Sequence, residues 1–333
     1  MAVEATAFAR AGLVGNPSDG YFGKTISITI RNFFAKVSLY ESPEVEIIPS
    51  MQDQSRYGSV RDLVRDVKEQ GYYGGVRLMK ATVRRFVDYC DAQGLKLHDR
   101  NFSLRYRSTI PRRVGLAGSS ALVTATLRCL VDYYKADIPK HLQPGLILSV
   151  ENQELGISAG LQDRVIQVYE DCVFMDFDRA LMESRGYGEY EDVDPALLPN
   201  IYIAYRTDLA EGSEVFHNNI RERWLRDDPE IIEAMRDFAG YAQQVRDLLV
   251  AGRKNEISPW LDANFNRRMT IYKISQANID MVMKARSTGA SAKFAGSGGA
   301  IVGTYEDEAM YQRLVQAFEG TKATVLKPQI SRS

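Results

Sequence analysis

The 333-residue chain has few of the residues that build disulfide frameworks, zinc sites or histidine-based catalytic centres. Its three cysteines, Cys90, Cys129 and Cys172, are widely spaced and set among apolar residues, which argues against a disulfide framework or a zinc site. Its three histidines are equally scattered, and none stands near a candidate Ser or Cys nucleophile. The sequence therefore predicts a reducing compartment and a chemistry that does not depend on histidine.

The chain also lacks a large net charge and a long apolar run. Its 42 basic and 43 acidic residues nearly cancel, so no overall field favours nucleic acid or a membrane surface. Residues 1–12 are too mixed for a signal peptide, and no apolar run reaches the roughly 20 residues that span a bilayer. We therefore expect a cytoplasmic protein without nucleic-acid or membrane partners, whose anionic ligands are held by local geometry. Nothing in the sequence indicates an oligomeric state.

Apolar periodicity predicts the order of the secondary-structure elements. Alternating isoleucines predict a strand over 25–30, followed by two further short strands over 37–42 and 45–50. Helices are then predicted between later strands, the longest over 229–252, and this grouping indicates an α+β fold with mostly antiparallel sheets. The acidic, proline-bearing stretch 186–200 is the best candidate for a domain junction, so we expect two domains, 1–190 and 191–333.

The most informative stretch is 111–123, PRRVGLAGSSALV, in which a glycine-rich turn runs into an apolar-periodic helix. Gly115 and Gly118 let the backbone approach a ligand closely, and Ser119 and Ser120 fall where the helix starts. Such a turn offers unpaired N–H groups and the positive end of a helix dipole to a phosphate, and a hydroxyl to a metal ion. The alternative interpretation is an ordinary helix whose first turn is capped by a serine.

Two segments nearly match familiar nucleotide-binding motifs, but their spacing and the elements that follow them argue against both assignments. SDGYFGKT, residues 18–25, has Ser18 where the Walker motif needs glycine, and a strand pattern follows instead of a helix. GSGGAI, residues 296–301, lacks the GxGxxG spacing and is better interpreted as a loop between two strands that can bring backbone against a ligand. Together with the GNPSDG turn at 15–20, three separate glycine turns predict convergence on one ligand site.

Three segments resemble, in order and spacing, the motifs of the GHMP small-molecule kinases. They are ARAGLVGNPSDGYFGKT at 9–25, PRRVGLAGSSA at 111–121 and KFAGSGGA at 293–300. These and the phrases QGYYGGVRLMKA at 70–81 and ELGISAGLQDRVIQVYED at 154–171 are most similar to the glucuronokinase branch of that family. The resemblance implies an N-terminal domain like ribosomal protein S5 domain 2, a C-terminal ferredoxin-like domain, and an active site in the cleft between them.

The resemblance also implies ATP and Mg²⁺ as cofactors and assigns residues to them. The metal ligands would be Ser120 and Glu151, with Glu154 as the alternative to Glu151. GLAGSS carries one residue more than the usual family motif, so Ser119 stays open as an alternative to Ser120. The ATP-binding set comprises Pro111, Gly115, Leu116, Ala117, Gly118, Ser119, Ser120 and Ala121.

For the acceptor, the resemblance makes Asp163 and Arg10 the catalytic pair. Asp163 would face the reacting hydroxyl, and Arg10 would polarise it and offset charge in the transition state. Asp19 would accept hydrogen bonds from sugar hydroxyls. Asn16, Lys24 and Gly298 complete the expected substrate-binding set. NPSD stands where galactokinases have EHTD, which argues against galactose as the acceptor.

The implied reaction transfers the γ-phosphoryl group of ATP to the anomeric hydroxyl of a sugar acid, D-glucuronate. A buried carboxylate needs a cationic partner, and Lys24, Arg112, Arg113 and Arg206 are the candidates. The alternatives are a neutral sugar such as arabinose or a heptose, a mevalonate-type substrate, or a catalytically silent ligand sensor. A silent member would be expected to lose a metal or base residue, whereas this chain has Ser120, Glu151 and Asp163.

Overall fold

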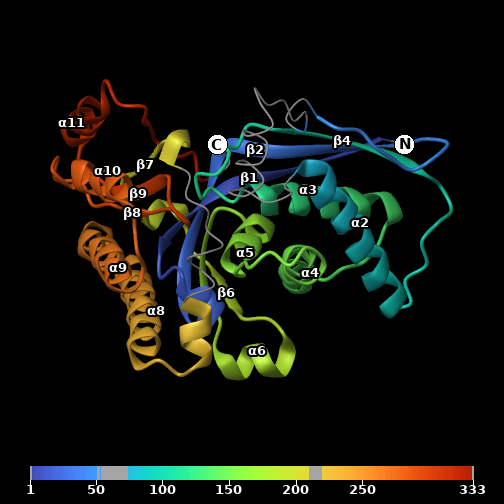
Figure 1. Ribbon diagram of the computed structural model, residues 1–333, viewed down its shortest axis with the longest axis horizontal. Helices are drawn as coiled ribbons and strands as arrows, with labels where there is room; N and C mark the ends of the chain where they lie inside the picture. The colour runs from blue at the N-terminus through green and yellow to red at the C-terminus, as the bar shows by residue number, and fades with distance from the viewer. Residues whose placement is uncertain (1, 51–52, 54–73, 210–219, 332–333) are drawn as a thin grey trace, which may run out of the picture.

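Figure 1 shows the computed structural model, which describes residues 2–50, 53, 74–209 and 220–331. Two sheets organise the chain, one of six strands and one of four. The first is built on the long antiparallel pair β1 (Ala2–Val14) and β2 (Lys24–Glu41). The other edge of β2 pairs with β4 (Phe102–Ser108) near its end and with β5 (Cys172–Asp176) near its start. The short strands β3 (Glu46–Ile47) and β6 (Glu189–Asp192) complete this sheet.

Strand β2 is one continuous strand, so the prediction of separate strands over 25–30 and 37–42 is wrong. The pairing shows why: Ala9 lies opposite Ile30, whereas its neighbour Phe8 lies opposite Phe34. Three residues of β2 are therefore extra at this point, which is a β-bulge. The bulge interrupts the two-residue alternation, and the sequence pattern consequently breaks in the middle of the strand.

Helices α2 (Gly75–Ala92), α3 (Gly118–Tyr134), α4 (Gln143–Ser149) and α5 (Gln162–Tyr169) lie together on one face of the first sheet (Figure 1). Helix α3 packs directly against β1 and β2 and is buried along most of its length. A π-helical turn, Val150–Glu154, continues α4. Helix α5 begins at Gln162, so Asp163 lies in its first turn.

The chain passes from the first sheet to the second between β6 and β7 (Ile201–Tyr205), near the predicted domain boundary. The short helix α6 (Arg179–Arg185) precedes this passage. The second sheet is antiparallel, in the order β10 (Thr324–Leu326), β7, β9 (Ala300–Thr304), β8 (Lys293–Phe294). Its helices are α8 (Pro229–Val250), α9 (Ser258–Ile271), α10 (Gln276–Arg286) and α11 (Glu308–Phe318).

Helices α8 and α9 pack back against the long strands of the first sheet (Figure 1). Val245 of α8 and Leu261 of α9 belong to the same hydrophobic core as Ile28 of β2 and Leu130 of α3. Burial of this shared apolar surface fixes the two halves relative to each other. It thereby brings the turn after β1, the loop before α3 and the β8–β9 loop to one place. Among the described residues, none of the helices has the length and hydropathy needed to cross a bilayer.

Candidate active site

The guanidinium of Arg10, on β1, is the centre of the candidate site. It is buried, and its Nε donates to Asp163 Oδ1 at 2.6 Å. Its Nη1 donates to the carbonyl oxygens of Gly115, at 2.5 Å, and Ala295, at 3.0 Å. One side chain therefore joins the first turn of α5 to both glycine-rich loops. The predicted catalytic pair is in direct contact, and the three partners come from segments far apart in the chain.

The two glycine-rich loops touch each other at Gly115. Its φ of +65° is in the left-handed region, and a Cβ there would lie 2.8 Å from the backbone nitrogen of Ser297 and 3.0 Å from the carbonyl oxygen of Gly298. A Cβ on Gly296 would collide with the carbonyl oxygen of Gly115 and lie 2.9 Å from Arg10 Nη1. Side chains are excluded at both positions because backbone and guanidinium occupy the space. Two of the three glycine turns that the sequence predicts to converge therefore lie against each other.

The loop before α3 leaves the start of that helix open. Helix α3 begins at Gly118 after Ala117, whose φ of 60° and ψ of 43° are left-handed. In the part of the chain that the structure describes, no side chain caps this helix, and its first turn holds no acidic residue. The Ser120 hydroxyl instead donates to the Ala117 carbonyl at 3.3 Å. The interpretation of these serines as ordinary helix caps therefore fails, and the first N–H groups of α3 lack a capping acceptor.

The remaining predicted residues of this loop contribute backbone and packing. Leu116 is buried, and its carbonyl accepts the Arg10 N–H at 3.3 Å. Ala121 is fully buried in the first turn of α3, and Pro111 is partly buried at the start of the loop. Ser119 is partly exposed, whereas Ser120 is completely enclosed. The loop thus presents main-chain groups and one serine hydroxyl at its surface.

Three acidic side chains and two arginines meet at the first turn of α5. Asp19, on the 3-10 helix Ser18–Tyr21, accepts hydrogen bonds from the backbone nitrogen of Gln162 at 3.2 Å and from its Nε2 at 3.3 Å. Arg164 forms a buried ion pair with Glu151, and its Nη1 lies 3.4 Å from Asp163 Oδ2. Buried charges are tolerated only when they are paired or hydrogen-bonded. The alternation of sign is what allows this cluster to be buried.

Asp19 is a carboxyl group of this cluster whose pKa is raised. Burial and the neighbouring charge of Asp163 raise the pKa of Asp19 to about 7, against the lowering effects of the Gln162 N–H, Arg10 and Arg164. A carboxyl group with this pKa exists in both forms near neutral pH. Asp19 can therefore either donate or accept a hydrogen bond at a ligand hydroxyl.

The two metal-ligand candidates on the π-helical turn have different surroundings. Glu151 is 2% exposed and is paired with Arg164 inside the cluster. The Glu154 carboxylate instead lies 2.8 Å from Nη1 of Arg84 on α2. Only Glu151 therefore contacts the charge cluster that contains Asp163, and a cation at Glu151 would compete with Arg164 for it.

The predicted substrate-binding residues separate into two groups. Asn16 contacts the buried Lys293, whose Nζ donates a hydrogen bond to Asn16 Oδ1 at 2.5 Å, and Gly298 lies against Gly115. Lys24 instead pairs with Asp176 at 2.6 Å and donates to Gln243 of α8 at 3.2 Å. Asn16 therefore lies at the site, whereas the Lys24 side chain is used in contacts that join β2 to β5 and α8.

Sequence reasoning missed Lys293, the first residue of the third motif. This side chain is buried, and its Nζ donates to the carbonyls of Gly12, at 2.7 Å, and Phe294, at 2.8 Å, besides Asn16. Burial, with Arg268 and Arg10 nearby, lowers the pKa of Lys293 well below its ordinary value. The lysine ties β8 to the turn after β1. Its place at the start of a motif was the available signal.

Sequence reasoning also missed one face of α9. Asn264 accepts the backbone N–H of Gly15 at 2.6 Å and donates to the carbonyl of Asn16 at 3.0 Å. Arg268, one turn later, donates from Nη1 to the carbonyl of Gly296 at 3.0 Å. The four-residue spacing of these polar residues within a predicted helix was a signal, but it does not distinguish a buried face from a solvated one.

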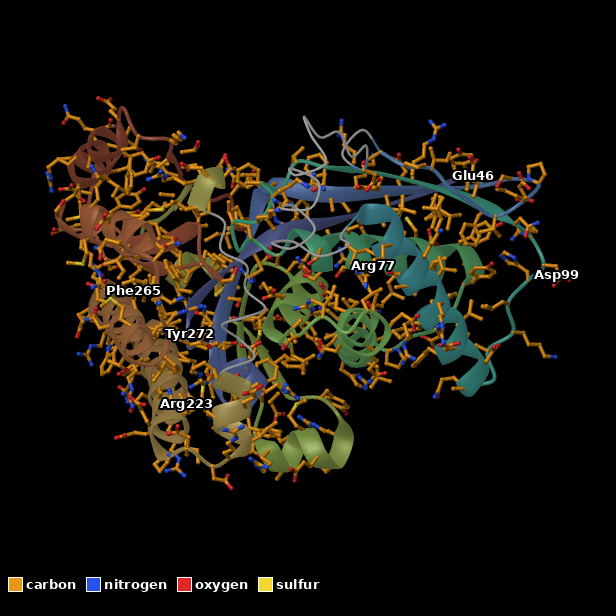
Figure 2. All side chains as sticks on the ribbon, viewed as in Figure 1. Glu46, Arg77, Asp99, Arg223, Phe265 and Tyr272 are labelled. Carbon is orange, nitrogen blue, oxygen red and sulfur yellow. The ribbon has the colours of Figure 1, made fainter. Side chains whose placement is uncertain are left out.

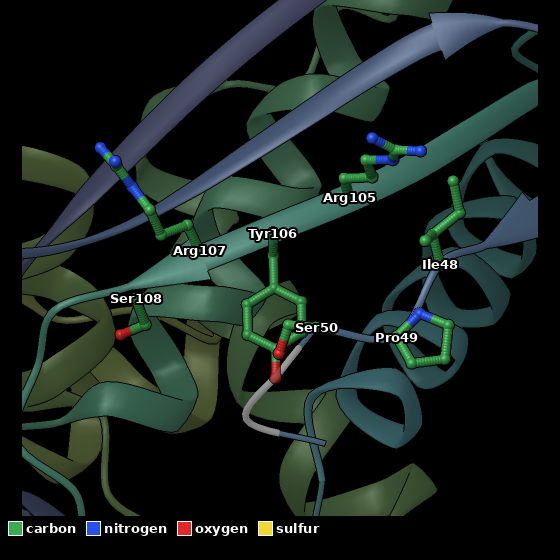
Figure 3. Close-up of a pocket in the computed structure, with 7 residues that line it drawn as sticks. All are labelled: Ile48, Pro49, Ser50, Arg105, Tyr106, Arg107 and Ser108. Carbon is green, nitrogen blue, oxygen red and sulfur yellow. The ribbon is translucent and has the colours of Figure 1, made fainter. Parts of the chain in front are cut away.

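A surface cavity of about 370 Å³ lies elsewhere, beside β3 and β4 (Figure 3). None of the predicted site residues lines it. In Figure 3 the side chains of Ser50 and Tyr106 lie together, whereas Arg105 and Arg107 project from the other side of the strand. Its lining residues are Ile48, Pro49, Ser50, Arg105, Tyr106, Arg107 and Ser108.

The two-sheet α+β fold, with an arginine–aspartate pair between two glycine-rich loops, defines a small-molecule kinase. The family model described as GHMP kinases N terminal domain matches residues 77–171. The chain is 42% identical over 307 residues to Glucuronokinase 1 of Arabidopsis thaliana, covering 90% of this chain and 84% of that protein. It is 44% identical over 306 residues to Probable glucuronokinase 2 of the same organism, covering 90% and 83%.

The solved structure of Lactococcus lactis galactokinase complexed with galactose has the same fold. It superposes with a TM-score of 0.74 at 16% identity and covers 99% of this chain and 93% of that one. The chain belongs to the GHMP kinases and, within them, to the glucuronokinase family. The predicted family and fold class are therefore confirmed.

The raised pKa of Asp19 predicts a pH-dependent gain in stability for Asp19→Asn. As pH rises from 3.8, the ordinary pKa, to about 7, the unfolded chain releases this proton while the folded protein retains it, so folding becomes less favourable. The asparagine variant avoids this loss, which is about 1.4 kcal/mol per pKa unit. Its melting temperature relative to wild type should therefore rise between pH 4.5 and 7.5 and then level off.

Asp208→Asn provides the control for this measurement. Arg206 lowers the pKa of the exposed Asp208 from 3.8 to about 2, so above about pH 5 this carboxyl group is ionised in both the folded and the unfolded chain. The melting-temperature difference of this variant should be nearly constant above pH 5. A constant difference for Asp19→Asn as well would contradict the raised pKa of Asp19.

Proposed function

We propose that this protein is an ATP-dependent kinase that converts D-glucuronate to glucuronate 1-phosphate in the cytoplasm. The observation that carries the proposal is the buried Arg10–Asp163 pair, held at 2.6 Å between the two glycine-rich loops. The choice of acceptor is supported by identities of 42% and 44% to two proteins named as glucuronokinases.

The pair suits phosphoryl transfer to a hydroxyl. The anomeric oxygen forms a bond to the γ-phosphorus, the bond from that phosphorus to the β–γ bridging oxygen breaks, and ADP leaves. The hydroxyl proton passes to the Asp163 carboxylate. Arg10 orients this carboxylate through Nε, and its guanidinium can offset negative charge that develops in the transition state.

The start of α3 supplies what the ATP phosphates need. The N–H groups of Gly118, Ser119 and Ser120 lie at a helix N-terminus without a capping side chain, where the dipole favours an anion. The nearby contact of Gly115 with the 296–299 loop brings further backbone to the same place. Asp19 and Asn16, which contact the other side of the cluster, are then left for the sugar hydroxyls.

Ser120 and Glu151 would hold Mg²⁺, and both are buried. The Ser120 hydroxyl donates its proton to the Ala117 carbonyl, so the oxygen lone pairs face away from that bond and suit a hard cation. Glu151 would exchange its contact with Arg164 for one with the cation. When bound, Mg²⁺ neutralises charge on the phosphate oxygens.

The acceptor is tested with a panel of sugars and an ADP-release assay. D-Glucuronate should give the highest kcat/KM, above glucose, arabinose, a heptose and mevalonate, and two-dimensional ³¹P–¹H NMR should place the phosphate on C1. A higher kcat/KM for a neutral sugar or for mevalonate would contradict glucuronate as the acceptor and identify that compound instead. Sugar binding without ADP release from any member of the panel would favour the ligand sensor.

Asp163→Asn should lower kcat by about 100- to 10,000-fold, the usual contribution of a positioned general base. The change keeps the shape of the side chain but leaves the buried Arg10 guanidinium without its carboxylate, so the melting temperature should fall, and ATP binding measured by calorimetry should show that the protein is still folded. Asp171→Asn is the matched control, because Asp171 also contacts an arginine, Arg31 at 2.7 Å, outside the cluster. Near-native turnover by a folded Asp163→Asn protein would place the base elsewhere.

The metal assignment predicts a change in the Mg²⁺ requirement. Glu151→Gln replaces a carboxylate ligand with a neutral amide oxygen and Ser120→Ala removes a hydroxyl ligand, so in each variant the Mg²⁺ concentration for half-maximal rate should rise by about tenfold or more. Ser119→Ala is the control and should leave that concentration within about twofold of wild type. The opposite result for the two serines would assign the metal to Ser119.

A further inference from the structure

The turn after β1 is held by two buried polar side chains from the second half of the chain. Asn264 of α9 accepts the backbone N–H of Gly15 at 2.6 Å and donates to the carbonyl oxygen of Asn16 at 3.0 Å. Lys293 of β8 donates to the Asn16 side chain at 2.5 Å. In Figure 2 Phe265, which follows Asn264, marks α9 beside the long strands of the first sheet. Both the backbone and the side chain of Asn16 are therefore fixed from outside its own turn.

The Lys293 ammonium determines which end of the Asn16 amide faces it. Its Nζ lies 2.7 Å from the Gly12 carbonyl oxygen, 2.8 Å from that of Phe294 and 2.5 Å from Asn16 Oδ1. A protonated lysine has three N–H donors and no acceptor, so these three oxygens satisfy it completely. If the amide were turned over, Nδ2 would face the ammonium, and two donors would oppose each other inside the protein. The amide is thereby held with Oδ1 toward Lys293.

The charge of Lys293 is opposed by its surroundings and supported by its hydrogen bonds. Burial and the guanidinium groups of Arg268 and Arg10 lower the pKa of Lys293 well below its ordinary value. The neutral amine, however, has only two N–H groups, so one of the three oxygens would face its lone pair. The three hydrogen bonds therefore favour the protonated form in the folded protein.

The other end of this amide, Nδ2, is available to a ligand. Asn16 is 2% exposed, yet within residues 2–50, 53, 74–209 and 220–331 its Nδ2 has no acceptor and keeps access to solvent. A Cβ on Gly12 would lie 3.1 Å from Asn16 Oδ1 and 3.1 Å from Gln162 Oε1, so both side-chain amides lie beside Gly12. Gln162 in turn binds both carboxyl oxygens of Asp19. Asn16 and Asp19 are thus close enough to contact one sugar ring.

We propose that Lys293 is a positioning residue, which fixes the Asn16 amide so that Nδ2 donates a hydrogen bond to an oxygen of the sugar acid. This inference rests on the proposed function, because it gives Asn16 one definite role toward the acceptor. Asp19 can donate or accept at a hydroxyl, whereas Nδ2 of the fixed amide can only donate. Lys293 acts through Asn16, since its own donors are already used within the protein.

Asn16→Asp tests the donor. Aspartate keeps the shape of the side chain and an oxygen toward Lys293, but it lacks the N–H groups. KM for D-glucuronate should rise about three- to tenfold, the range of one neutral hydrogen bond. The kcat should stay within about twofold of wild type, because substrate and transition state lose the same contact. The melting temperature should not fall, because the new carboxylate pairs with the lysine.

D-Glucuronamide, a neutral acceptor of nearly the same shape, separates loss of the donor from charge repulsion. Its KM should rise by the same factor in Asn16→Asp. A rise for the acid alone would indicate repulsion by the new carboxylate, and an unchanged KM for both acceptors would show that Nδ2 donates to neither. Either result would overturn the inference.

Lys293→Met tests whether the lysine acts through Asn16. Methionine keeps a long unbranched side chain but donates no hydrogen bond, so the amide is free to turn over. KM should rise about three- to tenfold in this variant, and by no further factor when Lys293→Met is added to Asn16→Ala. A purely structural role of Lys293 would multiply the two factors. If the methionine variant does not fold, Lys293→Gln, which offers the amide both a donor and an acceptor, replaces it in the same cycle.

Tyr202→Phe is the control for loss of a buried hydrogen bond in the second sheet. The Tyr202 hydroxyl donates to the Ser291 carbonyl at 2.8 Å, and the side chain is fully buried. The melting temperature should fall while KM stays within about twofold of wild type. A rise in KM equal to that of Lys293→Met, or multiplied factors in the cycle, would overturn the role of Lys293 and leave the proposed function intact. Failure of the wild-type enzyme to phosphorylate glucuronate would instead overturn the proposed function itself.

Discussion

The buried guanidinium of Arg10 is the constraint on which the rest of the site depends. A charge removed from water destabilises a fold unless it is fully compensated, and the partners of Arg10 are Asp163, the Gly115 carbonyl and the Ala295 carbonyl. These partners belong to a helix and two loops that are distant in sequence. Satisfying one side chain therefore fixes the first turn of α5, the loop before α3 and the third motif relative to one another.

The ionisable groups around this centre have pKa values that are shifted by burial. Asp19 holds a proton to about pH 7 because of burial and Asp163, and burial lowers the pKa of Lys293 well below its ordinary value. Because the pKa of an acid is raised and the pKa of a base is lowered, groups of both signs are held away from water here. Such clusters are typical of functional sites, where a charged ligand replaces the missing solvent.

The sequence predicted what depends on local chemistry. Gly115 and Ser120 were identified because glycines and a helix start stand next to each other in the chain, and Asp163 because its motif is local. The bulge in β2 was missed because it is defined by pairing with Phe8 and Ala9 on another strand. Arg268 was missed because its partner, Gly296, and the site that it faces are assembled only by folding.

This division has a physical basis in what the two substrates require. The phosphates of ATP need backbone N–H groups in a tight turn, and glycine-rich turns leave a strong local pattern. A sugar acid needs a few polar side chains at the correct positions, and a helix on the other side of the site can supply them. Asn264 and Arg268 lie on α9, where the spacing of polar residues resembles that of any solvated helix. The glycine-rich turns are therefore readable from sequence, whereas the contacts of Asn264 and Arg268 depend on the packing of α9 against β1 and β8.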